Sequence, residues 1–143
     1  GIVLKLIVSE PLSARVQSFV GRRRRAVPVN WLVELEVRNA LHAKFFRHEM
    51  GDQQLADCLQ LYDQLISEGK LLGLPLRAEA VVAAALKLVP ELTPATGCRT
   101  LDLMHVAAAR LVRCGRFISS DKRQLRAARA VGLETVDMES ATG

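Results

Sequence analysis

The sequence predicts a three-layer α/β/α domain with a mainly parallel central sheet. Short apolar runs, several of them β-branched, are typical of strands buried in a parallel sheet. They alternate with longer runs whose apolar residues recur at helical spacing. No internal repeat or low-complexity linker divides the chain. Residues 1–143 are therefore expected to form one domain around one core.

Cap and turn residues mark the predicted elements of the amino-terminal half. Pro11 is tolerated in a first helical turn, and Asn30 and Asp52 are suitable N-caps. Gly21 and Gly69 mark helix ends. In chain order we expect a buried strand over 3–8, a helix from Ser9 to about Val20, a strand over 26–29, a helix from Asn30 to about His48, a helix from Asp52 to Gly69 and a strand over 71–74.

The carboxyl-terminal half continues the same alternation. An alanine-rich run is strongly helical, and Pro90 is expected to terminate it because proline lacks the backbone N–H that a helix interior needs. Residues 91–99 contain two Thr, one Pro and one Gly, which indicates a loop. The expected elements are a helix over 78–89, a helix capped by Thr100 that runs to Val112, a strand over 116–118, a helix over 121–130 and a strand over 134–138.

Composition narrows the class of function. Lys and Arg number 20 against 15 Asp and Glu, a net charge of +5 that suits a polyanionic substrate, although a basic solubilising surface would look the same. No run approaches the roughly 20 apolar residues of a membrane span. Cys58, Cys98 and Cys114 are widely spaced and odd in number, which favours reduced thiols in the cytoplasm and does not favour zinc.

Three carboxylates are the candidate site residues. Glu36, Asp102 and Asp121 each lie at or near the start of a predicted helix, inside an otherwise apolar context. Carboxylates brought close together need a compensating cation, and hard oxygen ligands select Mg²⁺ or Mn²⁺. This pattern predicts a metal-dependent phosphodiesterase. The plain alternatives are a solvated helix charge for Glu36, a favourable helix-dipole position for Asp102 and an N-cap for Asp121.

Four motifs follow one another along the chain. They are Leu4-Lys5-Leu6 with Ser9-Glu10-Pro11, Glu36-Val37 with Ala40-Leu41, Leu101-Asp102 with His105 and Ala108, and Ser120-Asp121-Lys122-Arg123 with Ala128 and Gly132-Leu133. Their order and spacing resemble those of the PIN-domain ribonucleases, and among them the VapC-type toxins of type II toxin–antitoxin pairs. The resemblance implies a parallel central sheet, a carboxylate cluster that binds Mg²⁺ or Mn²⁺, and cleavage of single-stranded RNA. It also implies control by a small antitoxin protein and suggests a homodimer.

One family residue has no counterpart here. The resemblance places an Asp at the end of the first strand, about two residues before Gly1. We expect that the sequence lacks the start of this strand, and that an Asp upstream would complete the enzyme. The alternative is a PIN-like domain without catalysis that binds RNA or protein.

Further residues are candidates for substrate contact. Arg38 and Arg99 are placed to hold a substrate phosphate, and Ser119 or Ser120 could hold a water or orient a carboxylate, although a helix cap explains either serine equally well. His105 shares a helix side with Asp102, and packing beneath the site is its commoner role.

The run Arg22–Arg25 could contact phosphates or be a solvated turn, and the stripe of Leu55, Leu59, Tyr62, Leu65 and Ile66 is expected to form core or a partner contact. The sequence does not specify which RNA is cut, whether DNA is a substrate, or how many metal ions bind.

Overall fold

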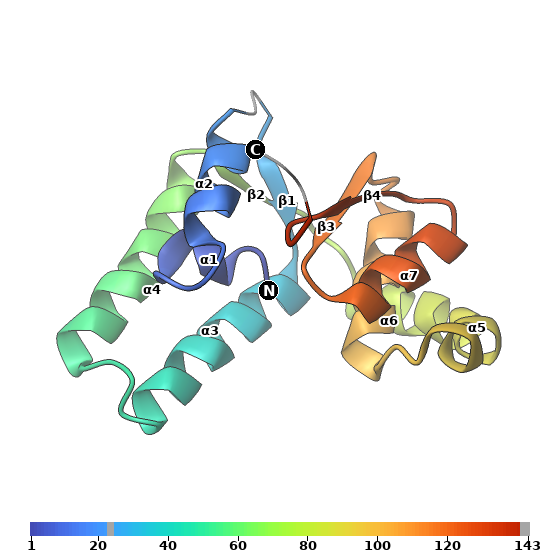
Figure 1. Cartoon of the computed structure of the whole chain (residues 1–143), viewed down its shortest axis with the longest axis horizontal. Coiled ribbons are helices and arrows are strands. Elements are labelled where there is room, and N and C mark those ends of the chain that lie inside the picture. Colours follow the sequence, from blue (N-terminus) through green and yellow to red (C-terminus); the bar gives the residue numbers. More distant parts are fainter. Residues whose placement is uncertain (23–24, 141–143) are drawn as a thin grey trace. The chain divides into compact units, whose positions relative to one another are not determined.

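The computed structural model describes residues 1–22 and 25–140, which divide into two compact units (Figure 1). One unit covers Gly1–Pro75 and the other begins at Leu76. Each unit contains one pair of short parallel strands and the helices that pack around it.

The predicted three-layer α/β/α fold with a central parallel sheet is wrong. Among the described residues, 62% are helical, in seven helices, and the four strands form two separate two-stranded parallel sheets. Each strand is only three or four residues long. Two-stranded pairs of this size need helices to cover them, so helix packing dominates both units.

The first unit places β1 beside β2, in the register Val27 to Leu71 and Val29 to Gly73. α3 packs on α4, and these two helices also contact β1 and β2, respectively. The elements of this unit are α1 (Leu4–Ile7), α2 (Ser13–Gly21), β1 (Val27–Val29), α3 (Trp31–Phe46), α4 (Asp52–Ser67) and β2 (Leu71–Gly73).

The buried strand expected over 3–8 is a short helix instead. Val3, Leu4 and Val8 are buried, a spacing that lines one side of a helical turn, whereas a strand covered on both faces of a parallel sheet would bury nearly every residue. Short apolar runs fit both periods, and the side on which the core lies decides between them. Here that core includes Val37, Leu41, Cys58, Tyr62 and Leu71.

The second helix begins later than predicted because the chain forms its own turn first. The backbone N–H of Glu10 donates to Ser13 Oγ over 2.9 Å, and this hydroxyl donates to the carbonyl of Val8 over 2.8 Å. Leu12 adopts a left-handed conformation, with φ 75°, immediately before α2 starts.

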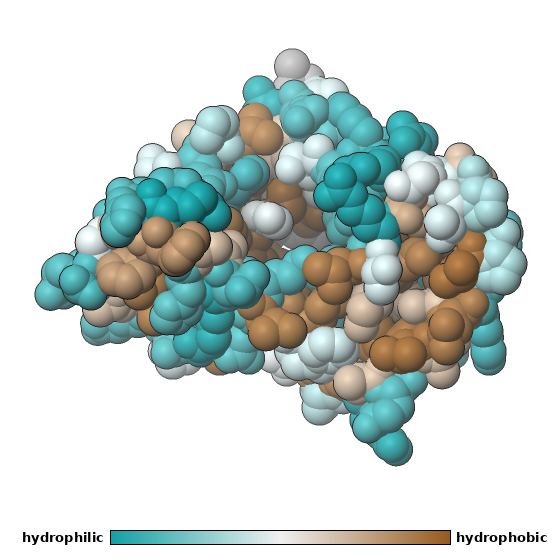
Figure 2. Space-filling model, turned by 90° about the horizontal axis from the view of Figure 1, so that it is seen from below, coloured by the Kyte–Doolittle hydropathy of each residue, from teal (hydrophilic) through white to brown (hydrophobic). Residues whose placement is uncertain are grey.

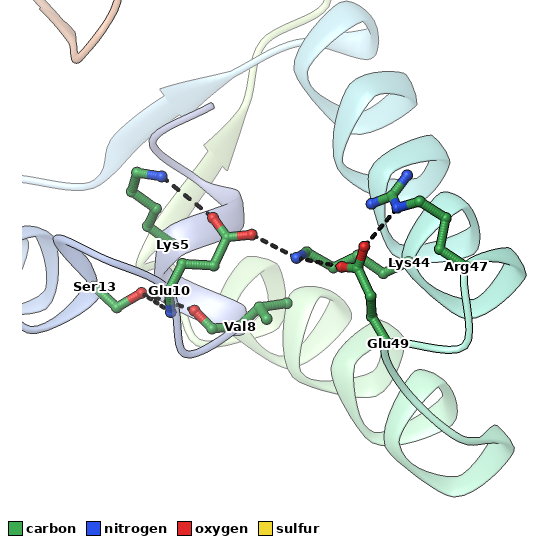
Figure 3. Close-up of polar contacts among 7 residues, drawn as sticks. All are labelled: Lys5, Val8, Glu10, Ser13, Lys44, Arg47 and Glu49. Carbon is green, nitrogen blue, oxygen red and sulfur yellow. Dashed lines mark hydrogen bonds and ion pairs between the residues drawn. The ribbon is translucent and has the colours of Figure 1, made fainter.

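A polar network holds this turn to α3 (Figure 3). The Glu10 carboxylate accepts from Lys5 Nζ over 3.2 Å and from Lys44 Nζ over 2.8 Å. Lys44 also reaches Glu49 over 3.1 Å, and Glu49 pairs with Arg47. The hydrogen bond from Lys44 is the main reason why the pKa of Glu10 lies below its usual value, although partial burial opposes the shift. The side chains of Glu10, Lys5 and Lys44 are mostly buried, so the network connects α1, the following turn and α3.

The second unit is built around the parallel pair β3 and β4, in the register Phe117 to Thr135 and Ser119 to Asp137. α7 connects the two strands and packs on both, and α5, α6 and α7 pack on one another. The elements are α5 (Ala78–Thr96), α6 (Thr100–Leu111), β3 (Arg116–Ser119), α7 (Lys122–Ala130) and β4 (Glu134–Asp137).

The predicted end of the alanine-rich helix at Pro90, and the loop predicted after it, are wrong. α5 runs through Pro90 and Pro94 to Thr96 and ends at Gly97, whose φ of 65° suits a glycine C-cap. The two prolines are four residues apart and both exposed, so water can satisfy the carbonyls that lose a helical partner. Leu88 and Leu92 are buried, and their packing keeps the segment helical.

Most of the remaining predicted elements are confirmed to within a few residues. Asn30 caps α3 by accepting from the N–H groups of Leu32 and Val33, and Asp121 caps α7. The N-caps of α4 and α6 are Gly51 and Arg99, one residue before the predicted Asp52 and Thr100.

Apolar side chains also reach the surface. Figure 2 shows hydrophobic surface on the side where α5 and α6 lie in Figure 1. Val82, Leu86 and Val89 are exposed at helical spacing along α5, on the face next to its buried stripe. No helix in residues 1–22 and 25–140 is long and apolar enough to cross a membrane.

The Glu10 network predicts a pH-dependent contribution to stability. We expect Glu10→Gln to lower the free energy of unfolding at neutral pH by about 1–2 kcal/mol, because two charge-assisted hydrogen bonds are lost. The folded pKa is lowered, so this stability is present above the ordinary Glu pKa and is lost as pH falls through the folded value. Urea unfolding between about pH 7 and about pH 3 measures it. A parent–variant difference that stays constant in acid would contradict the role of Glu10. Glu79→Gln, at an exposed pair with Arg77, is the control and should change little.

The course of α5 makes a second prediction. Pro90→Ala should raise the free energy of unfolding by about 1–2 kcal/mol, since alanine restores a helical N–H and removes an interior proline. Pro75→Ala, outside any helix, is the control and should not stabilise. Equal effects of the two substitutions in urea unfolding would show that no helix passes through position 90.

Candidate functional site

The second unit gathers polar side chains at one edge of its strand pair. Parallel strands end at the same edge, so Ser119 at the end of β3 lies beside Asp137 at the end of β4. The backbone N–H of Met138 donates to the carbonyl of Ser119 over 2.9 Å and closes this edge. Asp121 follows β3 directly and begins the connection to α7. Two sequence-predicted site residues, Ser119 and Asp121, therefore lie at the carboxyl end of a strand, where α/β proteins commonly bind ligands.

A hydrogen-bonded chain connects this edge to the third predicted residue, Asp102. Ser119 is buried, and its hydroxyl donates to Gln124 Oε1 over 2.7 Å. Gln124 Nε2 then donates to Asp102 Oδ1 over 3.4 Å, a long bond. The other oxygen of Asp102 accepts from the backbone N–H of Arg99 over 2.9 Å, across the first turn of α6. Gln124 thus orients Asp102 from α7, 22 residues further along the chain.

Asp121 is held by the same residues. Its backbone N–H donates to Ser119 Oγ over 3.0 Å, and its Oδ1 accepts from the N–H groups of Arg123 and Gln124 over 2.8 and 3.3 Å. Partial burial acts to raise the pKa of Asp121, but the two backbone hydrogen bonds and the Arg123 charge outweigh it and lower the pKa. The carboxylate is therefore ionised at neutral pH and available as an anionic ligand.

Asp137 and Gln124 belong to this site, although the sequence analysis did not single them out. Lys122 Nζ lies 2.7 Å from Asp137 Oδ2, and this hydrogen bond is the main cause that lowers the pKa of Asp137 to about 2. The available signal for Asp137 was a carboxylate near the end of the strand predicted over 134–138. Gln124 carried no signal, because only the packing of α7 on α6 brings it to Asp102. We call Asp102, Ser119, Asp121, Gln124 and Asp137 the strand-end cluster.

The remaining predicted carboxylate, Glu36, lies in the first unit. It is half-buried on α3, close enough to the Gly1 amine to interact with it electrostatically. The pKa of this amine is lowered, first by burial and then by Lys5, while Glu36 acts in the opposite direction.

Arg38, on the same helix, is already engaged by neighbouring groups. It pairs with Glu34 over 2.9 Å and with Asp63 over 2.8 Å, and its guanidinium lies 5.4 Å from the centre of the Tyr62 ring. The hydrogen bond that Arg38 donates to Glu34 is the main cause that raises the pKa of Arg38. In this arrangement Arg38 ties α3 to α4.

The remaining candidates occupy different surroundings. Arg99 is exposed at the start of α6, and Ser120 and His105 are half-buried in the second unit. Arg22 ends α2, and Arg25 is exposed, while Arg23 and Arg24 lie outside the described residues.

The carboxylate oxygens of the strand-end cluster belong to the ligand class that hard divalent cations prefer. Mg²⁺ is commonly bound through one or two carboxylates, with water and substrate phosphate completing its shell. Asp102 and Asp121 supply two such groups, each with one oxygen committed to backbone N–H donors that orient it. Within residues 1–22 and 25–140, no group of three or more His, Cys, Asp or Glu side chains is arranged to hold a metal ion.

Comparison with known proteins found no family model and no curated protein that matches the chain.

The cap at Asp121 gives a direct test of the site's local structure. Asp121→Ala should lower the free energy of unfolding by about 1 kcal/mol, because two N–H groups of α7 lose their acceptor. Asp121→Asn should change the free energy of unfolding by only a few tenths of a kcal/mol, since its amide oxygen caps equally well. Thermal or urea unfolding measures both, with Asp52→Ala as control at an exposed helix start that has no cap bond. An Asn variant as unstable as the Ala variant would argue against the cap.

Proposed function

We propose that the chain is a divalent-metal-dependent endoribonuclease, and that it acts in the cytoplasm as the toxin of a type II toxin–antitoxin pair. The observation that carries the proposal is the link between Asp102 and Asp121 through Ser119 and Gln124. The order of the motifs, which resembles that of the VapC-type ribonucleases, supports the substrate class and the partner, a small antitoxin protein. A homodimer is part of the same proposal.

In this proposal Asp102 and Asp121 hold Mg²⁺ or Mn²⁺. Such an ion, when bound, lowers the pKa of water and offsets the negative charge that develops on the phosphate. The protein's own contribution is orientation. Ser119 donates to Gln124, and Gln124 donates to Asp102. Because both of these bridging side chains are neutral, they orient the carboxylates without placing a charge between Asp102 and Asp121.

The carboxylates also have a role in proton transfer. Asp121 Oδ2 is not used by the two cap bonds, and Arg123 Nη2 lies 3.7 Å from it. This oxygen can orient an attacking water and accept its proton as the water oxygen bonds to phosphorus. The P–O bond to the leaving ribose oxygen then breaks, and solvent protonates that oxygen. No side-chain nucleophile is required.

Glu36 lies on α3 in the first unit, where it interacts electrostatically with the Gly1 amine. The resemblance assigns it as a further metal ligand, and this assignment stays a prediction.

A second function is favoured by a specific observation. Both Asp102 and Asp121 already cap helices, so each carboxylate has a structural role that needs no chemistry. A domain that binds RNA or protein without cleaving it accounts for these two residues equally well.

Cleavage of a structured RNA pool separates the two functions. The protein should cut with Mn²⁺ or Mg²⁺ and not with chelator. Asp102→Asn and Asp121→Asn should each lower the rate by at least about 100-fold while the protein stays folded, because catalytic carboxylate sites lose most of their activity without one ligand.

Asp52→Asn is the matched control, since it removes an exposed carboxylate from the first turn of a different helix. It should cut like the parent. An Asp102→Asn protein that cuts RNA as fast as the parent would exclude the proposed catalytic role. Absence of cutting by folded parent protein with any metal would favour the binding domain.

A further inference from the structure

The outer face of α7 is strongly basic. Lys122, Arg126 and Arg129 are exposed at helical spacing with Arg123 beside them, whereas Leu125 and Ala128 are buried. The helix contains no acidic residue. Between Cys98 and Gly132 the sequence has eight bases and two acids.

This placement of charge is unfavourable for the helix itself. Like charges three and four residues apart repel one another along α7. Lys122 and Arg123 also lie in its first turn, where the helix dipole disfavours positive charge. A face that served only for solubility would normally intersperse acids and bases. The pattern therefore points to an anionic ligand.

The four bases fall into two pairs. Lys122 faces Asp137 and Glu139 over 2.7 and 3.3 Å, and Arg123 faces Asp121 over 3.7 Å. Arg126 and Arg129 form no ion pair with a carboxylate in the part of the chain that the structure describes.

Neutral acceptors hold these two arginines instead. Arg126 Nη2 donates to the carbonyl of Thr96 over 3.1 Å, and Arg129 Nε donates to Thr135 Oγ1 over 2.8 Å. A guanidinium has five N–H donors, so each arginine is oriented and keeps most of its donors for another ligand. Fixed, exposed and un-neutralised guanidinium groups suit phosphate oxygens, which they can bind in a bidentate manner.

We propose that Arg126 and Arg129 bind successive phosphates of single-stranded RNA and lead the strand along α7 toward the strand-end cluster. This inference rests on the proposed function and assigns the substrate-binding surface of the same site. Asp121 caps the helix that carries both arginines, and Lys122 and Arg129 are about 10 Å apart along its axis. A backbone held on this face therefore runs past the cap at which Asp121 lies.

Binding of a fluorescently labelled single-stranded RNA of mixed sequence tests this without catalysis. Anisotropy is measured in EDTA over a range of salt concentrations, with the double variant Arg126→Gln/Arg129→Gln. Each lost phosphate contact should make the negative slope of log K against log salt shallower by about 0.7, so the slope of the double variant should be shallower by about 1.4. At about 0.1 M salt this corresponds to roughly 25-fold weaker binding, independent of RNA sequence.

The control Arg77→Gln/Lys87→Gln removes the same charge from two exposed positions of the same unit, the N-cap of α5 and the middle of that helix. It should change affinity less than about twofold. Arg126→Lys/Arg129→Lys keeps both charges and should retain most of the salt slope, which separates phosphate binding from damage to the fold. Equal weakening by the α5 control, or an unchanged slope in the Arg126→Gln/Arg129→Gln protein, would overturn the assignment. So would equal competition by polyglutamate of matched charge, because the site would then bind any anionic chain.

The outcomes also separate this inference from the proposed function. If RNA binding depends on Arg126 and Arg129 but the parent does not cut RNA with any metal, the nuclease proposal is wrong and the binding face is supported. If the double variant cuts RNA at the parental rate and binds it with unchanged affinity, the binding face is wrong and the nuclease proposal is supported.

Discussion

Parallel strand pairing is the constraint on which both units depend. Two parallel strands cannot be joined by a tight turn, so the chain between them must cross over and pack on the pair. In the first unit α3 and α4 make this crossing, and in the second unit α7 makes it. The crossing also brings the carboxyl ends of both strands to one edge. This is why Ser119, Asp121 and Asp137 lie together, and why the helix that follows Asp121 takes part in the site.

In the strand-end cluster, a few hydrogen bonds both cap α7 and orient the carboxylates of Asp102 and Asp121. Ser119 accepts from one backbone N–H and donates to Gln124, and Gln124 in turn donates to Asp102. The same residues cap α7 and orient the two carboxylates. A side chain that caps a helix is already held in one direction, so a ligand that binds there requires little further ordering. Structural and chemical roles for Asp102 and Asp121 are therefore compatible in one protein.

Sequence patterns predicted the local elements well where one signal dominated. Asn30 before an apolar run predicted the start of α3, and the N-cap given as the plain alternative for Asp121 is present at the start of α7. They failed where two signals competed. The run over 3–8 fits a strand and a helix equally, and Pro90 is a helix breaker whose effect the burial of Leu88 and Leu92 outweighs. The fold class failed with them, because the central strand and the sheet that it would join were assigned from these ambiguous runs.

By itself, the sequence determined the positions of most helices and of the short strands. It also determined the excess of Lys and Arg over Asp and Glu, and which carboxylates to test. Caps, periodicity and charge are local properties, so a sequence contains them directly. Only the tertiary structure decided that the strands pair two by two, that α5 continues past its prolines, and that Gln124 reaches Asp102 across 22 residues. Those outcomes depend on contacts between distant segments, whose energies no local pattern contains.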